Sequence, residues 1–299
     1  MIPVRRWLPL VLLVGLVGGY AVVCVQQNLD ASLAPFQTEV NELYLPSGEW
    51  VKRLSFGYDG LVACIYWTRA VQHYGRQRLD ASAGGTANYA LLYALLDITT
   101  TLDPELLLAY RFGAVFLTEP PPGGPGRPDL AVKLLEKGIQ NNPDYWRFWY
   151  DLGFVYYRAK NYQKASEAFY KGAEQPGAAP WMRVMAAKVL AEGGDREKSR
   201  ALWWEVYQST DDKTIQWNAL NHLTGLRVDD EIEFLEKVLK GYAQKTGRPA
   251  QTWQELMAAG VLRRVPADPA GFPYRLSPDG RVLLSPQSPI KTSTLGREK

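Results

Sequence analysis

The chain has 299 residues, 46% of them hydrophobic and 22% charged, a balance typical of folded proteins and not of disordered ones. The formal net charge of +3 is too small an excess to predict a protein dedicated to nucleic-acid binding. With only two cysteines and two histidines, the chain cannot form a disulfide scaffold, a zinc finger or a histidine-rich metal site.

Residues 7–25 read WLPLVLLVGLVGGYAVVCV, a stretch of 19 residues without a charge. As a helix it would extend roughly 28 Å, which matches a bilayer core. Arg5 and Arg6 precede it, and the next basic residue is Lys52. The positive-inside rule therefore predicts a cytoplasmic stub and transmembrane anchor at 1–29. We expect a linker at 30–54 and the bulk of the chain in the extracytoplasmic space at a bacterial inner membrane.

Two alternatives to a retained anchor stay open. A cleaved secretory signal also begins with basic residues and an apolar run, although this run is longer than a usual signal core and no small-x-small cleavage pattern follows it. Lipid modification of Cys24 is less favoured, because Val22 and Val23 are bulky. Cys64 has no obvious mate, and we expect it to be a small buried hydrophobic residue.

Between residues 55 and 245, apolar residues recur at three- and four-residue steps, which predicts helices. One window carries seven spaced residues: Trp149, Leu152, Gly153, Tyr156, Ala165, Phe169 and Pro176. This spacing resembles the tetratricopeptide repeat, W-x2-L-G-x2-Y followed by A-x3-F and a proline. The resemblance implies an all-α fold, a right-handed α-solenoid of about five helix pairs. In it, Gly153 and Ala165 would let two helices approach closely, and Trp149 and Tyr156 would pack between helices.

The pattern continues at a spacing of 34 residues. Adding 34 gives residues of the same size class, namely Ala187, Leu190, Ser199 and Trp203. A further step gives Trp217 and Leu220 at the start of a helix, with 228–242 as its partner. Towards the N-terminus we expect helices at 59–74 and 88–101, then at 104–117 and around Ala131. The insertion 118–128 holds PPPGGPGRP, which predicts an exposed, partly extended loop.

Residues 246–286 change character. Thr252 with Glu255 predicts a capped helix that stops at Gly260, and 277–280 (SPDG) predicts a hairpin turn between strands at 272–276 and 281–284. We interpret this piece as a helix-plus-β-hairpin cap on the array. Its order also resembles the C-terminal region of type II secretion pseudopilins, although no pilin processing site precedes the apolar segment. Residues 287–299 are expected to be a disordered tail.

No phosphate-binding loop, nucleophile elbow, H-E-x-x-H pair or C-x-x-C motif is present, so the sequence predicts no enzyme, cofactor or metal. The tetratricopeptide resemblance instead implies a protein-binding groove lined by the first helix of each pair. Its predicted residues are Arg147, Tyr150, Phe154, Tyr157, Arg158, Trp181, Val184 and Lys188. Tyr150, Phe154 and Tyr157 could equally pack between helices.

We therefore expect a membrane-anchored scaffold whose partners are other envelope proteins or peptide segments. The first alternative is a permanent subunit or assembly factor of a membrane complex or a secretion or pilus system, which a large exposed aromatic patch outside the groove would favour. The second is an enzyme with an unrecognised site, which acidic groups gathered around His222 in an enclosed pocket would favour.

Overall fold

The computed structural model describes residues 20, 24–25, 47–277 and 279–292. Of the predicted membrane segment at 7–25, only residues 20, 24 and 25 are among these residues, and most of the predicted linker at 30–54 lies outside them. Within the described part, no helix combines the length and the apolar character needed to cross a bilayer. The chain divides into two units, residues 1–56 and 57–299.

In the first unit the described element is helix α2 (Gly48–Leu54), which occupies the end of the segment predicted to be a linker. Ser47 caps it, because the Ser47 hydroxyl accepts a hydrogen bond from the Trp50 amide at 3.4 Å. The Trp50 and Leu54 side chains are exposed. A seven-residue helix is too short to produce a readable apolar period, which explains why the sequence did not predict it.

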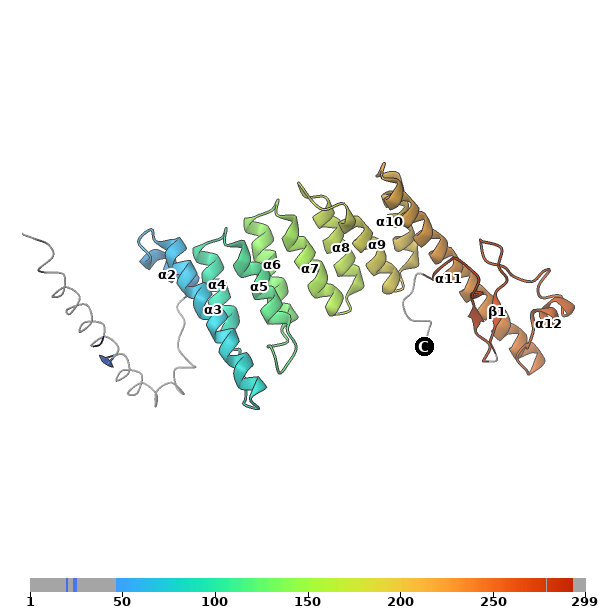
Figure 1. The fold of residues 1–299 in the computed structure, drawn as a ribbon, viewed down its shortest axis with the longest axis horizontal. Coiled ribbons are helices and arrows are strands. Elements are labelled where there is room, and N and C mark those ends of the chain that lie inside the picture. The colour runs from blue at the N-terminus through green and yellow to red at the C-terminus, as the bar shows by residue number, and fades with distance from the viewer. Residues whose placement is uncertain (1–19, 21–23, 26–46, 278, 293–299) are drawn as a thin grey trace, which may run out of the picture. The chain divides into compact units, whose positions relative to one another are not determined.

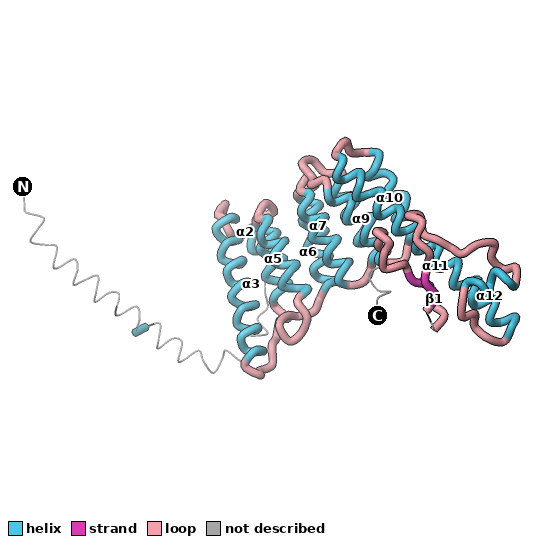
Figure 2. The backbone as a smooth tube through the Cα atoms, turned by 45° about the vertical axis from the view of Figure 1, so that its right-hand side comes forward, coloured by secondary structure: helices cyan, strands magenta, loops and turns pink. Residues whose placement is uncertain are grey.

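The second unit is an array of helices that ends in a small β-hairpin (Figure 1). Its elements are α3 (Asp59–Ser82), α4 (Leu92–Leu102), α5 (Leu107–Thr118), α6 (Pro128–Asn141), α7 (Trp146–Arg158), α8 (Tyr162–Ala173), α9 (Trp181–Glu192), α10 (Arg196–Gln208), α11 (Lys213–Thr246), α12 (Trp253–Ala258), β1 (Arg275–Leu276) and β2 (Val282–Leu283). From α3 to α11 each helix packs against the next in chain order (Figure 2). Four predicted helix pairs are thus confirmed: α3–α4, α5–α6, α7–α8 and α9–α10.

Small residues hold the predicted close contacts between paired helices. A Cβ atom added at Gly153 would lie only 2.6–2.8 Å from three ring atoms of Phe169 in α8. One repeat later, Ala187 and Ser199 are both fully buried, and the Ser199 hydroxyl donates to the Ala187 carbonyl oxygen at 2.8 Å. The 34-residue register is therefore confirmed in the packing of α7–α8 and α9–α10.

The turns between paired helices repeat as well. Asn161 caps α8, and its side-chain oxygen accepts from the Lys164 amide at 3.2 Å. Asp195, 34 residues later, caps α10 by accepting from the Lys198 amide at 3.2 Å. Gly194 supplies the positive φ of 85° that the turn before this cap requires.

The predicted fifth pair is wrong, because residues 213–246 form one continuous helix, α11. Its sequence holds no proline near the expected turn, and the Thr224 hydroxyl donates to the Leu220 carbonyl inside the helix at 2.8 Å instead of capping a new one. The two halves of α11 bury different faces. Ala219 and Leu226 join the α9–α10 core, whereas Val228 and Ile232 pack against the cap.

The proline-rich insertion is compact, so the expectation of a partly extended loop is wrong. The Arg127 amide donates to the Leu117 carbonyl at 2.7 Å, and the Gly126 amide donates to the Glu119 carbonyl at 2.8 Å. Gly124 is buried, and the Tyr89 hydroxyl donates to the Gly123 carbonyl at 2.9 Å. These bonds close the loop on itself and hold it to the segment before α4.

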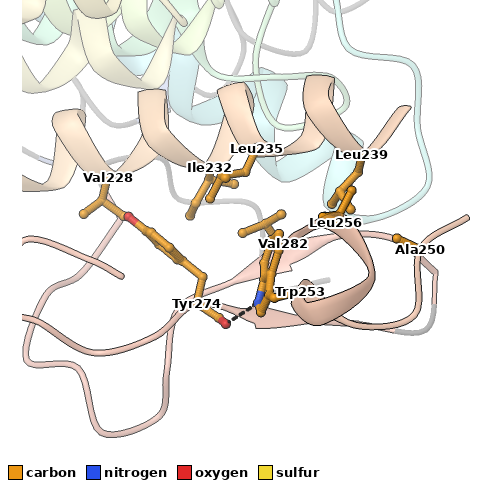
Figure 3. Close-up of a cluster of buried hydrophobic side chains, with 9 residues drawn as sticks. All are labelled: Val228, Ile232, Leu235, Leu239, Ala250, Trp253, Leu256, Tyr274 and Val282. Carbon is orange, nitrogen blue, oxygen red and sulfur yellow. Dashed lines mark hydrogen bonds between the residues drawn. The ribbon is translucent and has the colours of Figure 1, made fainter. Parts of the chain in front are cut away.

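The C-terminal piece packs on the second half of α11, as predicted for a cap. Figure 3 shows Trp253 and Tyr274 beside the apolar face of α11, and the Trp253 indole donates to the Tyr274 carbonyl at 2.8 Å. The Tyr274 hydroxyl donates to the Glu231 carboxylate at 2.7 Å. Thr252 caps α12 through the Glu255 amide, which confirms the predicted helix start.

Three smaller expectations are corrected by the structure. The hairpin strands have two residues each, because the preceding segment holds Pro273 and forms only an isolated bridge with Ala267. The tail is ordered at Ile290, which is half-buried against the cap, and residues 293–299 lie outside the described residues. Cys64 is exposed on α3 and not buried.

Candidate protein-binding surface

The first helices of three successive pairs meet along one side of the array. Arg111 of α5 forms a bidentate ion pair with Asp151 of α7, with Nε–Oδ2 at 2.5 Å and Nη2–Oδ1 at 3.2 Å. Trp181 of α9 meets Tyr150 and Trp146 of α7, with ring centroids 5.2 Å and 5.9 Å apart. These contacts bring α5, α7 and α9 together in the order that a binding groove requires.

The eight predicted groove residues fall into two groups. Four are exposed: Arg147, Arg158, Trp181 and Lys188. The other four, Tyr150, Phe154, Tyr157 and Val184, are half-buried. The structure thus places cations and one indole on the surface and most of the predicted rings in a layer beneath it.

The half-buried rings support this surface from below. Phe154 meets Phe169 edge-on at 5.5 Å, and Tyr150 lies 4.8 Å from Phe154. The Tyr157 hydroxyl donates to Glu192 of α9 at 2.7 Å, and this bond is the main cause of a raised pKa for Tyr157. Val184 packs into the α9–α10–α11 core and does not line the surface. The packing of these rings stabilises the fold, and it also fixes the position of the backbone that carries the exposed side chains.

None of the ion pairs among the described residues includes Arg147, Arg158 or Lys188, although the charge of Arg147 acts on the Asp151 carboxyl. The Arg147 guanidinium instead lies 4.5 Å from the Trp146 ring centroid, a cation–π contact. In contrast, Asp151 is occupied by Arg111, and burial raises the pKa of its carboxyl despite that pairing. The local excess of positive charge favours a partner with acidic groups.

An apolar section of this surface was missed by the sequence analysis. Leu108, Phe112 and Val115 of α5 each expose about half of their side chains, at 53%, 50% and 55%. Around the helix axis, these three residues lie between two contact positions. Arg111 contacts α7, and Phe116 stacks on Tyr74 of α3 with ring centroids 4.2 Å apart. Their i, i+4, i+7 spacing was visible in the sequence, but the same spacing is also typical of a buried face. We call this section, with the four exposed predicted residues, the first-helix surface.

Trp149 and Tyr156 are less enclosed than predicted. Both are half-buried and line an open cavity of about 390 Å³ between α6 and α8. Lys171 lies 5.4 Å from the Trp149 ring and Lys164 lies 5.5 Å from the Tyr156 ring. Both rings thus lie between helices as predicted, but they are not fully enclosed, and a lysine side chain lies over each ring.

His222 is stacked on the buried Trp203 ring at 4.1 Å, and its pKa is lowered by burial and by the charge of Lys188. A histidine with a lowered folded-state pKa stabilises the fold above about pH 6.5 and loses that contribution as the pH falls. We therefore expect the free energy of unfolding to fall between pH 7 and 5, and to fall less steeply in His222→Gln. Urea titrations at each pH measure this, and equal slopes in both proteins would contradict it.

Among the described residues, no three His, Cys, Asp or Glu side chains come together as a metal site would require.

The family model described as Tetratricopeptide repeat matches residues 124–175, a segment that spans α6, α7 and α8. No curated protein matches the chain. The family match falls on the pair that carries Arg147, Tyr150, Phe154 and Arg158, and it supports a tetratricopeptide repeat protein that serves as a protein-interaction scaffold.

Proposed function

We propose that this chain is a membrane-anchored, extracytoplasmic scaffold that binds segments of other envelope proteins on its first-helix surface. The observation that carries the proposal is the row of exposed, unpaired cations beside exposed indole and aliphatic groups. Arginine and lysine bind carboxylates, and rigid aromatic rings give contact area at a low entropic cost. The segment that fits is amphipathic, with apolar side chains over α5 and acidic ones over α7 and α9. The proposal assigns no reaction to the chain.

The proposed attachment rests on the sequence of residues 7–25, which lie largely outside the described residues. Their 19 uncharged positions and the preceding Arg5 and Arg6 support a single retained span in a bacterial inner membrane, with the array on the far side from the cytoplasm. Attachment to the membrane would confine the search for partners to the membrane surface. Such confinement raises the effective concentration of partners that share the membrane.

Reversing the charge of two exposed arginines tests the binding surface. In Arg147→Glu/Arg158→Glu, we expect partner recovery to fall at least tenfold, because attraction to acidic groups becomes repulsion. Recovery is measured by affinity purification from detergent-solubilised membranes, with mass spectrometry of the chains that co-purify. Thermal melting should shift little, since both side chains are exposed.

The matched control is Lys240→Glu/Arg264→Glu, which makes the same charge change at exposed residues of α11 and the cap. This variant should recover partners as the unaltered chain does. Equal recovery by all three proteins would refute the proposed surface, and equal losses in both variants would indicate a general effect of charge.

A permanent subunit or assembly factor is the second candidate, and two exposed indoles outside the first-helix surface favour it. Trp204 of α10 is 49% exposed and Trp217 of α11 is 67% exposed. Large exposed aromatic groups are typical of surfaces that a partner covers. A partner that stays bound through size-exclusion chromatography, and is lost in Trp204→Ala/Trp217→Ala but not in the arginine variant, would select this candidate.

A further inference from the structure

One side of α11 carries a row of exposed and half-exposed side chains. Its members alternate at steps of three and four residues, the spacing by which two helices pair side by side. Trp217, Leu220 and Phe234 are its apolar members, exposed by 67%, 41% and 62%, and Trp204 of the neighbouring α10 is 49% exposed. These four are the large apolar side chains that α10 and α11 expose. We call the row the α11 stripe; it consists of Trp217, Leu220, Thr224, Arg227, Glu231 and Phe234.

The continuous α11 explains why this stripe is uncovered. Helix α8 packs on α7 and α10 packs on α9, but residues 228–246 extend α11 and do not fold back on its first half. The cap covers another side of α11, that of Val228 and Ile232, as Figure 3 shows. From the cap, the Tyr274 hydroxyl reaches the edge of the stripe at Glu231. The rest of the stripe is free to meet another helix.

The charges of the stripe complement a second, inverted copy of it. Arg227 and Glu231 are its charged residues, and their side chains form an ion pair at 2.8 Å. Asp230 and Glu233 belong to the side of α11 that faces α10, where Arg196 binds both. In a parallel pair of stripes, arginine would face arginine and glutamate would face glutamate. In an antiparallel pair, Arg227 of each copy faces Glu231 of the other, and the charges attract at both places.

A hollow beside the stripe fits the Phe234 ring. It is open, has a volume of about 450 Å³, and is lined by Glu197, Arg200, Ala201, Trp204 and Leu223. Leu223 precedes Thr224 of the stripe, so the hollow borders the stripe at that level. In the antiparallel register that the charges set, Phe234 of one copy comes level with Thr224 of the other. The exposed phenyl ring of each copy can therefore enter the hollow of the other copy.

The size of the contact is sufficient for a reversible dimer. An aromatic side chain buries about 150–250 Å² in full, so covering the exposed parts of Trp204, Trp217 and Phe234 in both copies removes about 700 Å² of surface. Leu220 and the flanking side chains bring the total to about 1,000 Å², the lower end for a specific interface. In the same register Trp217 comes level with Gly241, where a Cβ atom would meet nothing within 4 Å. The indole thus has room.

We propose that two copies of this chain form an antiparallel dimer through the α11 stripe. A second copy is the occupant because one register satisfies both observations: it brings opposite charges together and places the exposed ring of each copy at the hollow of the other. The inference goes beyond the proposed function, since the dimer uses no residue of the first-helix surface.

Complementary charge variants test the register. Sedimentation velocity of the full chain in density-matched detergent measures the dimer, which we expect for the unaltered chain. Arg227→Glu leaves only glutamates where the stripes cross, and Glu231→Arg leaves only arginines, so each variant alone should dimerise at least tenfold more weakly. An equimolar mixture should regain the dimer, because each arginine again faces a glutamate. Glu231→Arg also loses the bond from Tyr274, but this loss persists in the mixture and cannot produce the recovery.

Distances between spin labels test the orientation. Lys213 and Asn221 are exposed, and each is replaced in turn by a labelled cysteine in a Cys24→Ser/Cys64→Ser background. Antiparallel pairing is centred at the level of residue 229. It places the two labels about 48 Å apart along the helix axis at position 213 and about 24 Å apart at position 221. A parallel pair would give short distances at both positions and would refute the proposal.

Two exposed phenylalanines provide matched variants. Phe234 is 62% exposed on α11, and Phe112 of the first-helix surface is 50% exposed on α5. Phe234→Gln should weaken the dimer at least tenfold and leave the recovery of other proteins unchanged, whereas Phe112→Gln should keep the dimer and lower that recovery. The dimer and the proposed binding surface can therefore fail separately.

Three results would overturn the dimer. The first is an unaltered chain that stays monomeric at high micromolar concentration, including one that retains a different protein until Phe234→Gln is introduced. The second is a dimer that Phe234→Gln does not weaken, because another surface would then hold it. The third is a mixture of Arg227→Glu and Glu231→Arg chains that remains monomeric.

Discussion

Replacing Gly153 with leucine is expected to lower the free energy of unfolding by about 3 kcal/mol, since overpacking a filled core has costs of this order. Even the first added atom, Cβ, would lie 2.6–2.8 Å from the Phe169 ring. That ring is fully buried and has Tyr150 and Phe154 against it, so it has no free space to move into. Urea denaturation of the detergent-solubilised chain, followed by far-UV circular dichroism, measures the loss.

The matched control is a helical glycine in open surroundings. A Cβ atom at Gly75 of α3 would meet nothing within 4 Å. Gly75→Ala should therefore raise the free energy of unfolding by up to about 1 kcal/mol, because alanine favours the helix. If Gly153→Leu unfolds at the same urea concentration as the unaltered chain, α7 and α8 do not make the close contact on which the repeat assignment depends.

The centre of the array could be predicted because its packing rule is local. The close contacts join helices that follow one another in the chain, Gly153 with Phe169 and Ala187 with Ser199, and the second repeat has the same arrangement as the first. The continuous α11 could not be predicted in this way. Its second half buries Val228 and Ile232 against the cap, and apolar spacing alone does not show whether a helix or a hairpin covers a face.

The exposure of the candidate site residues could not be predicted. The tetratricopeptide resemblance implied Arg147, Phe154 and Arg158 for the groove, and the structure leaves both arginines exposed and Phe154 half-buried. Whether a ring of α7 is exposed depends on the next helices, since Phe169 and Trp181 come from α8 and α9. For the same reason the exposed Phe112 of α5 could not be told from a core residue.

Truncation of Trp253 to alanine is expected to detach the cap from α11. The Trp253 side chain is 7% exposed, lies within the apolar cluster of Figure 3, and donates its indole hydrogen to the Tyr274 carbonyl. Loss of a buried tryptophan costs about 3–5 kcal/mol. We expect trypsin to cleave after Arg263 and Arg264 at least tenfold faster, while the α3–α10 helices keep their circular dichroism.

Two further substitutions separate packing from hydrogen bonding in that result. Trp253→Phe keeps a ring in the cluster but leaves the Tyr274 carbonyl without its donor, so about 1–3 kcal/mol should be lost. Trp217→Ala removes a 67% exposed indole from the same helix that the cap covers, and its effect should stay within about 0.5 kcal/mol. If Trp253→Ala and Trp217→Ala are cleaved equally slowly, the cap is held by contacts other than this cluster. In that case two hydrogen bonds still join the hairpin segment to α11, from the Tyr274 hydroxyl to Glu231 and from the Val282 amide to Glu236, and Tyr274→Phe tests the first of them directly.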